Sequence, residues 1–241
     1  MVKVKGALAF AAVLFAGCVG AEQPPETTIR KNIEARLGAT AKVESVTATP
    51  YGGLYEVRIG NEIIYTDKNA DYLFIGNVFN AKTSQNLTKA RTDELNKIKF
   101  SDLPLGLALK TVKGNGERVI AIFEDPNCGY CKKFRQTTLR QADNITVYTF
   151  MYNILSPDSF VKSTNVWCSA DRNKTWDDWM LSGKVPPTAA KKCDTPNEKV
   201  VELGQRLRIE GTPAIFFADG TRFAGMVDIK TLEAKLATIK K

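Results

Sequence analysis

The feature that most constrains the fold of this 241-residue chain is a pair of cysteines, Cys128 and Cys131, separated by two residues. The pair follows Val119 to Phe123, a continuous β-branched and aromatic run that is typical of a buried strand. Residues 130–139 can form a helix, and Ile145 to Met151 is a second buried run. This order predicts a βαβ unit whose connection turns at the cysteines.

Two thiols at this spacing suit thiol–disulfide exchange, in which a thiolate attacks a disulfide and a second thiol resolves the mixed disulfide. At the first turn of a helix, the unpaired N–H groups and the positive end of the helix dipole favour the thiolate. We therefore expect Cys128 to attack and Cys131 to resolve, as a redox-active pair. A structural disulfide or half of a metal site is the alternative, but the strand-to-helix position favours redox chemistry.

The charged residues near the motif lead to two further expectations. Thioredoxin-like reductases often have an acidic residue six positions before the first cysteine, and here that position is Ile122. Glu124 and Asp125 are the nearest acids, and we expect them in solvent near the strand end, so no buried proton acceptor is evident. Lys132 and Lys133 add positive charge nearby, and we expect them on a solvated helix face.

The first residues have the pattern of an export signal. Lys3 and Lys5 precede an apolar run from Ala7 to Val19, which is too short to span a membrane. Cleavage after Ala21 would yield a soluble exported protein. Alternatively, the residues leading to Cys18 resemble a lipoprotein box, in which that cysteine would be acylated. We favour the soluble form.

Cysteine and histidine usage limits the remaining chemistry. Cleavage after residue 21 leaves four of the five cysteines, and the chain has no histidine. A zinc site would need all four cysteines on one metal, so we expect no metal and no cofactor. Cys168 and Cys193 have no close cysteine partner, and we expect them to form a structural disulfide. The net charge of +8 comes from scattered Lys and Arg, which favours a solvated surface over nucleic-acid binding.

Residues 22–86 are expected to form a small α+β domain. Ile29, Ile33 and Leu37 recur at helical spacing and predict one helix. Strand-like segments follow at Val43–Thr47, Tyr55–Ile59, Glu62–Thr66 and Tyr72–Gly76. Such a sheet is too small to bury much surface alone, so we expect Tyr72 to Ile75 to form an edge between two subunits.

Residues 87–116 are expected to be a linker, and residues 117–241 a catalytic domain. Thr88 to Lys99 predicts a helix with little apolar surface, and Ser101 to Gly116 contains proline and glycines. The later chain predicts helices at Ser163–Leu181, Asn197–Ile209 and Ile229–Ile239, with a hairpin at Asp219-Gly220.

A second motif supports the cysteine pair. Thr212 and Pro213 directly precede a strand at Ala214 to Ala218, where a proline is permitted because it supplies no ladder N–H. In a thioredoxin-like fold, a cis proline here packs against the cysteines and leaves the preceding backbone free to pair with a substrate peptide. We therefore expect Thr212, Pro213, Gly129 and Tyr130 to bind substrate.

With these residues assembled, the chain resembles the DsbC family of periplasmic disulfide isomerases from Gram-negative bacteria over nearly all of its mature length. The segments that carry the resemblance are Cys128-Gly129-Tyr130-Cys131, Gly211-Thr212-Pro213-Ala214, Trp167-Cys168, Asp171-Arg172-Asn173-Lys174 and Ile63-Ile64-Tyr65-Thr66-Asp67. One departure is Lys132, which stands where a histidine often follows the motif.

The resemblance implies an α+β, cystatin-like N-terminal dimerisation domain, a linker helix, and an α/β thioredoxin-like domain with a helical insertion. It implies a homodimer whose cleft binds misfolded exported proteins with chaperone-like activity. It also implies a DsbD-type membrane reductase that keeps Cys128 and Cys131 reduced.

The implied activity is disulfide isomerisation in the periplasm, and two other functions stay open. One is the DsbG-type reduction of oxidised single cysteines, a branch that usually has proline after the first cysteine, where this chain has Gly129. The other is a holdase chaperone whose disulfides are permanently locked.

Overall fold

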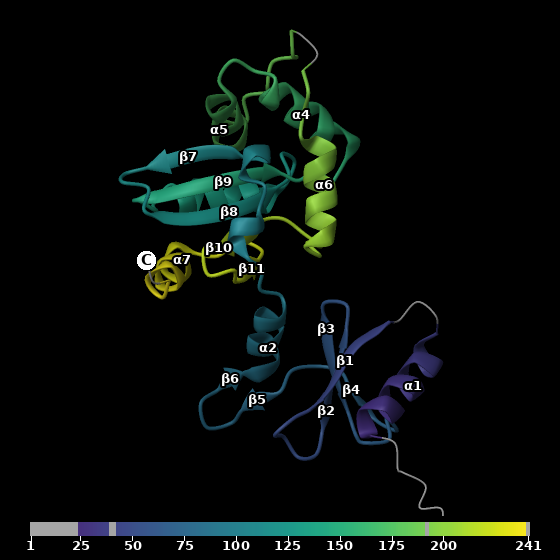
Figure 1. Cartoon of the computed structure of the whole chain (residues 1–241). Helices are drawn as coiled ribbons and strands as arrows, with labels where there is room; N and C mark the ends of the chain where they lie inside the picture. Colours follow the sequence, from purple (N-terminus) through teal and green to yellow (C-terminus); the bar gives the residue numbers. More distant parts are fainter. Residues whose placement is uncertain (1–23, 39–41, 191–192, 240–241) are drawn as a thin grey trace, which may run out of the picture. The chain divides into compact units, whose positions relative to one another are not determined.

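A computed structural model describes residues 24–38, 42–190 and 193–239 of the chain (Figure 1). The expected signal over residues 1–21, with Cys18, lies outside these residues. The chain divides into two compact units, with the division between Gly76 and Asn77. Within the described ranges, no helix is long and apolar enough to cross a bilayer.

The first unit is one helix packed on a four-stranded antiparallel sheet. The elements are α1 (Pro25–Leu37), β1 (Val43–Ala48), β2 (Tyr55–Ile59), β3 (Glu62–Thr66) and β4 (Leu73–Phe74), and the strand order is β1-β2-β3-β4. Ile29 and Ile33 of α1 are buried against Val57 and Ile64 of the sheet. These positions are the apolar stripe that the helical spacing predicts.

The expected strand from Tyr72 to Gly76 is shorter in the structure, because a turn extends into it. The carboxylate Oδ1 of Asp67 accepts hydrogen bonds from the backbone N–H groups of Asp71 (2.8 Å) and Tyr72 (2.9 Å). Pairing with β3 therefore begins at Leu73.

The second unit begins with a short hairpin and a helix. These elements are β5 (Phe79–Asn80), β6 (Gln85–Asn86) and α2 (Leu87–Leu95). Asn86 caps α2, because its side-chain oxygen accepts a hydrogen bond from the backbone N–H of Lys89 at 2.8 Å. After the helix, the backbone N–H of Ile98 donates to the carbonyl of Gly220 at 3.0 Å, which ties this segment to the turn between β10 (Ala214–Phe217) and β11 (Arg222–Ala224).

The expectation that residues 101–116 belong to a linker is wrong. Leu109–Lys113 forms β7, an edge strand that pairs antiparallel with β9 (Ile145–Met151). Leu109 is buried while Lys110 and Val112 are exposed, so the segment has the two-residue period of a half-buried strand. The lysines and the glycines that follow mask this period in the sequence. Leu103, upstream, is also buried in the core of the second unit.

The second unit is built on a five-stranded sheet in the order β11-β10-β8-β9-β7. Its strands are β7 (Leu109–Lys113), β8 (Arg118–Glu124), β9 (Ile145–Met151), β10 (Ala214–Phe217) and β11 (Arg222–Ala224). β8 and β9 are parallel, and the other neighbours are antiparallel. The central position of β8 places the residues that follow it at the middle of the sheet edge.

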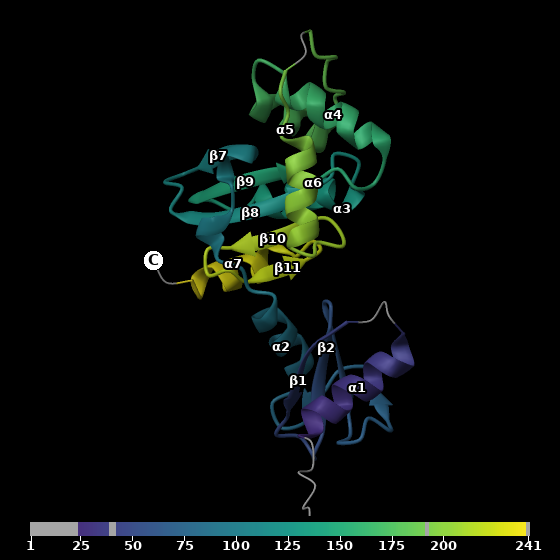
Figure 2. The same ribbon diagram turned by 45° about the vertical axis from the view of Figure 1, so that its right-hand side comes forward.

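Helices cover both faces of this sheet. They are α3 (Gly129–Phe134), continued by a π-helical turn (Arg135–Leu139), α4 (Pro157–Trp167), α5 (Arg172–Ser182), α6 (Asn197–Arg206) and α7 (Ile229–Ala237). Ile120 and Ile122 face the core formed with α3, the π-helical turn and α7. Ala121 and Phe123 face α6, which runs across the sheet (Figure 2).

The insertion contains two helices where the sequence predicted a single one over Ser163–Leu181. The first helix ends at Trp167, and the second begins after Asp171, whose carboxylate accepts from the backbone N–H of Lys174 at 3.0 Å. Cys168 lies in this break and forms a disulfide with Cys193, with their Cα atoms 5.9 Å apart. The bond ties the end of α4 to the segment that leads into α6.

Candidate active site

The loop between β8 and α3 is held by a buried aspartate. Asp125 is fully buried, and its Oδ1 accepts from the Asn127 backbone N–H and the Ser159 hydroxyl, each at 2.8 Å. Its Oδ2 accepts from the backbone N–H groups of Ile154 (2.8 Å) and Leu155 (3.0 Å). The expectation that this acid lies in solvent is wrong, because these four donors replace its hydration.

A tryptophan of the insertion also holds this loop. The indole Nε1 of Trp179 donates to the carbonyl oxygen of Pro126 at 2.6 Å. The position of the cysteines therefore depends on α5 and on the chain before α4. The insertion is part of the site's framework.

Cys128 is the N-cap residue of α3, and its sulfur faces the first turn of that helix. The backbone N–H of Cys131 donates to the Cys128 Sγ at 3.2 Å. The Cys128 pKa is lowered to about 6, first by a hydrogen bond from the Cys131 side chain, then by the Thr212 side chain and by the backbone N–H groups of Cys131 and Tyr130. Cys128 is thus mostly thiolate at neutral pH.

Cys131 has the opposite electrostatic environment. It is completely buried, whereas 5% of Cys128 is exposed, and both are free thiols in this structure. Burial raises the pKa of Cys131 far above its usual range, and the hydrogen bond to Cys128 and the negative charge of Glu124 raise it further. Cys131 therefore keeps its proton while Cys128 is ionised.

Thr212 and Pro213 lie directly beside the nucleophilic sulfur. The Thr212–Pro213 peptide bond is cis, and the Cys128 Sγ lies 3.3 Å from the Thr212 carbonyl oxygen, to which it donates a hydrogen bond when it is protonated. Tyr130 is 67% exposed, and a Cβ on Gly129 would meet no atom within 4 Å. The structure thus brings all the expected substrate-binding residues to one surface around Cys128.

Lys132 differs from the solvated residue that we expected, whereas Lys133 is exposed. Lys132 is half-buried, with its Nζ 3.7 Å from the centroid of the Trp179 ring. Lys162 lies against the same ring at 4.8 Å. Burial and the charge of Lys162 lower the pKa of Lys132. A cation–π contact therefore holds this lysine close to the cysteine turn.

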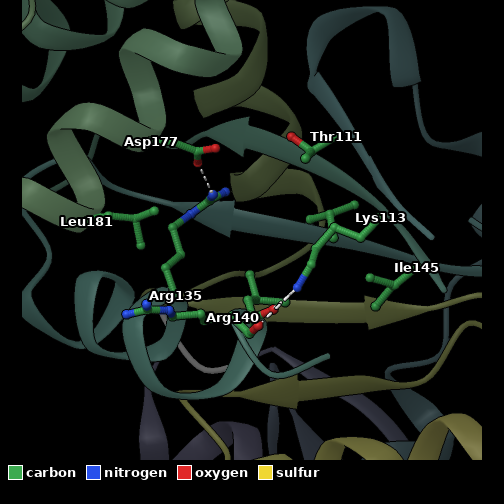
Figure 3. Close-up of a pocket in the computed structure, with 9 residues that line it drawn as sticks. Thr111, Lys113, Arg135, Arg140, Ile145, Asp177 and Leu181 are labelled. Carbon is green, nitrogen blue, oxygen red and sulfur yellow. Dashed lines mark hydrogen bonds and ion pairs between the residues drawn. The ribbon is translucent and has the colours of Figure 1, made fainter. Parts of the chain in front are cut away.

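Glu124, at the end of β8, is the second acid that we wrongly expected in solvent. It is fully buried, and its Oε2 lies 2.7 Å from Nε of Arg135, which is also buried. Arg135 donates further to Asp177 (3.0 Å) and to the Thr149 hydroxyl (2.6 Å). Figure 3 shows Arg135 directed toward Asp177. Both residues line a cavity of about 330 Å³. Burial raises the pKa of Glu124, and the charge of Arg135 opposes this shift.

One signal for this buried ion pair was present in the sequence. Arg135 follows Cys131 by four residues, so the two share one face of the helical segment that packs on the sheet. A cation on a buried helix face needs a buried anion. Glu124, at the end of a buried strand, was the nearest acid able to supply it.

The fold and the cysteine turn define a thioredoxin-fold thiol–disulfide oxidoreductase. A paired strand–helix–strand unit, an N-capping cysteine with a lowered pKa, a buried second cysteine and an adjacent cis proline together form this type of site. Among the described residues, no group of three or more His, Cys, Asp or Glu is arranged to hold a metal ion.

Comparisons with known proteins identify the family. Residues 20–89 match the disulfide bond isomerase protein N-terminal domain, and residues 105–240 match a thioredoxin-like domain. A probable thiol:disulfide interchange protein DsbC from Bordetella parapertussis is 50% identical over 194 residues, which cover 80% of this chain and 68% of that protein. The chain therefore belongs to the DsbC family of thiol:disulfide interchange proteins, which confirms the expected family and fold class.

More distant relatives agree with this assignment. The thiol:disulfide interchange protein DsbC of Escherichia coli (strain K12) is 27% identical over 226 residues, covering 92% of this chain and 90% of that protein. The crystal structure of a disulfide interchange protein from Neisseria gonorrhoeae superposes with a TM-score of 0.53 at 36% identity. It covers 56% of this chain and 97% of that one.

Proposed function

We propose that the protein is a periplasmic thiol–disulfide isomerase that rearranges non-native disulfides in exported proteins. Cys128 attacks a wrong disulfide, and Cys131 resolves complexes that fail to rearrange. The observation that carries this proposal is the placement of the two thiols: the Cys128 Sγ faces the first turn of α3 and lies beside the cis Thr212–Pro213 bond, whereas Cys131 is completely buried. The lowered pKa keeps Cys128 ionised and able to attack, and the raised pKa keeps Cys131 protonated and slow to attack. The freed substrate thiol therefore has time to form its native disulfide before Cys131 resolves the complex.

The surface around Cys128 supports a role in binding unfolded chain segments. Tyr130, two residues after Cys128, has an exposed aromatic ring, and the Thr212 carbonyl oxygen lies 3.3 Å from the Cys128 Sγ. We infer that the backbone before Pro213 pairs with a substrate strand while Tyr130 and Gly129 contact its side chains. Replacing Tyr130 with Ala should raise the KM for a disulfide-bonded peptide and leave the alkylation rate of Cys128 unchanged.

The test of isomerisation is the recovery of activity from scrambled ribonuclease. The wild-type protein should restore the enzyme, and Cys128→Ser should abolish recovery. Cys131→Ser should retain the attack but accumulate mixed disulfides, which an intact-mass measurement detects. Retained recovery with Cys128→Ser would overturn the proposal.

The two alternatives are separated by their substrates and redox states. A DsbG-type reductase should act faster on a protein carrying a cysteine sulfenic acid than on scrambled ribonuclease, and Gly129 argues against that branch. A holdase with locked disulfides should show no free thiols when freshly isolated. The isomerase should show two, from Cys128 and Cys131, with Cys168 and Cys193 disulfide-bonded.

We further propose that the first unit forms a homodimer, whose cleft binds misfolded chains. β4 lies at an edge of its sheet, and apolar side chains in and beside this strand are exposed: Tyr72, Phe74 and Ile75. An apolar sheet edge that no other strand covers favours pairing with a second copy of the chain. Phe74→Asp should convert the dimer to a monomer in sedimentation, whereas Val185→Asp, at an exposed apolar residue of the second unit, should not.

Export and reduction complete the proposal. We place the mature protein in the periplasm, in soluble form, and we propose a DsbD-type membrane reductase as the source of electrons. The intact mass of the exported protein distinguishes cleavage after Ala21 from acylation at Cys18. Cys128 should become oxidised in cells that lack such a reductase.

A further inference from the structure

The buried thiol of Cys131 needs a proton acceptor before it can attack. Its surroundings hold it protonated, and the chain has no histidine to remove the proton. Only a thiolate attacks a disulfide at a useful rate. Some group beside Cys131 must therefore accept its proton when the mixed disulfide is resolved.

Glu124 is placed to be that group. Cys131 and Arg135 lie one helical turn apart on the same buried face, and Arg135 binds Oε2 of Glu124 at 2.7 Å. In the parallel register of β8 and β9, Glu124 lies opposite Met151, which packs in the same apolar cluster as Cys131. The ion pair therefore brings the carboxylate to the side of the helix that carries the buried thiol.

One oxygen of this carboxylate is free. Oε1 of Glu124 is buried and has no hydrogen-bond partner within the part of the chain that the structure describes. A buried carboxylate oxygen without a donor is costly, and such atoms call for an explanation in function. An oxygen that receives a proton each time Cys131 resolves a mixed disulfide provides one.

We propose that Glu124 is the proton acceptor for Cys131, with Arg135 as the residue that positions it. As the proton moves to Glu124, the sulfur of Cys131 bonds to that of Cys128. The bond between Cys128 and the substrate sulfur breaks, and its electron pair leaves with the substrate as a thiolate. The cysteine pair is oxidised and the substrate sulfur is reduced.

The proton returns when the enzyme is reduced again. A dithiol reductant attacks Cys128, Cys131 leaves as a thiolate, and the carboxylic acid of Glu124 reprotonates it. The charged groups that act on Glu124 are Arg135 beside it, Asp177 from α5, and the Cys128 sulfur. Burial raises the pKa of Glu124, which strengthens it as a base toward a thiol.

The inference rests on the proposed roles of the two cysteines, and one experiment separates the two ideas. Mixing the reduced protein with the aromatic disulfide DTNB releases one coloured thiolate when Cys128 attacks and a second when Cys131 resolves. Absence of the first phase in the wild-type protein would contradict the proposed function. A normal first phase followed by a second phase whose rate does not depend on Glu124 would contradict only this inference.

In Glu124→Gln, the second phase should slow by about 100-fold, the scale of general-base catalysis. The first phase should be unchanged or faster, because removing a nearby negative charge favours the Cys128 thiolate. Asp177→Asn is the matched control, because it also removes a carboxylate from Arg135, and its second phase should stay near the wild-type rate. Equal slowing in both variants, or equal slowing of both phases, would contradict the proposal.

The pH profile provides a readout that a structural role would not change. The wild-type second phase should level off once Glu124 is ionised, whereas in Glu124→Gln it should rise about tenfold per pH unit with hydroxide. A wild-type profile in the variant would overturn the inference. If the variant fails to fold because Arg135 is left unpaired, Glu124→Gln combined with Arg135→Met removes both charges and allows the same measurement.

Discussion

The sulfur of Cys128 lies 3.3 Å from the carbonyl oxygen of Thr212, to which it donates a hydrogen bond when it is protonated, although 84 residues separate the two in the chain. β8 and β10 are neighbours in the sheet, with Phe123 opposite Ala214. Cys128 follows the end of β8 and Thr212 precedes the start of β10, so both lie at the same edge of the sheet. The reactive sulfur and the proposed peptide-binding backbone thus share one short stretch of surface.

The titration of Cys128 is the first prediction. Because its pKa is about 6, the alkylation rate should rise between pH 5 and 7 and then level off. Because folding lowers the pKa of Cys128, its ionisation stabilises the reduced protein. This contribution is fully present above the unfolded-state thiol pKa of about 8.5 and is lost as pH falls through about 6. Thiolate absorbance against pH checks the midpoint, and Cys128→Ser should lack the transition.

Cys131→Ala should raise the pKa of Cys128. The variant removes the side-chain hydrogen bond that is the largest cause of the lowered value. A rise of one unit would cut the thiolate fraction at pH 6 from about one half to about one tenth. The same alkylation titration measures the shift, and an unchanged midpoint would show that the backbone N–H groups suffice.

Asp125→Ala should destabilise the protein by about 3 kcal/mol, because it leaves buried donors at Ile154, Leu155 and Ser159 without their acceptor. The matched control is Asp158→Ala, since this exposed acid also binds the loop, through the Asn127 side chain at 2.9 Å. It should change the free energy of unfolding by less than about 0.5 kcal/mol. Urea denaturation of both variants decides between them.

Replacing Cys168 and Cys193 with Ala should lower the free energy of unfolding and leave the reactivity of Cys128 unchanged. The disulfide closes a loop with a sequence separation of 25, worth about 3.5 kcal/mol on the loop-entropy model. Denaturation with Cys128 and Cys131 kept reduced measures this loss. Alkylation of Cys128 should keep its wild-type midpoint, because neither residue contacts that sulfur directly.

Gly204→Ala should destabilise the protein, although alanine is normally the better helix residue. A Cβ at Gly204 would lie 2.2 Å from Cε2 of Tyr152, a buried ring whose hydroxyl is anchored to the Ile209 carbonyl at 3.0 Å. Overpacking of this kind costs about 1–3 kcal/mol. Gly106→Ala, with open space around its Cβ, is the control for thermal unfolding.

Much of the fold could be read from local patterns. The buried runs at β8 and β9, the strands β2 and β3, and the apolar spacing of α1 and α7 agree with the structure because each depends on neighbouring residues alone. β7 was missed because Val112 lies on its exposed face and Lys113 on its half-buried face, next to a glycine turn, so no clear alternation of apolar and polar residues marks the strand.

The sequence by itself determined the chemistry of this protein: the position of Cys128 and Cys131 at a strand-to-helix turn, the proline motif and the family. Only the tertiary structure decided which charges are buried. We expected Asp125 in solvent because no nearby residue along the chain indicates its partners, and we expected Glu124 there because its partner Arg135 lies 11 residues away, beyond the cysteine turn. Arg135 and the loop before α4 surround them only after folding, since burial of a charge depends on donors that distant segments bring to it.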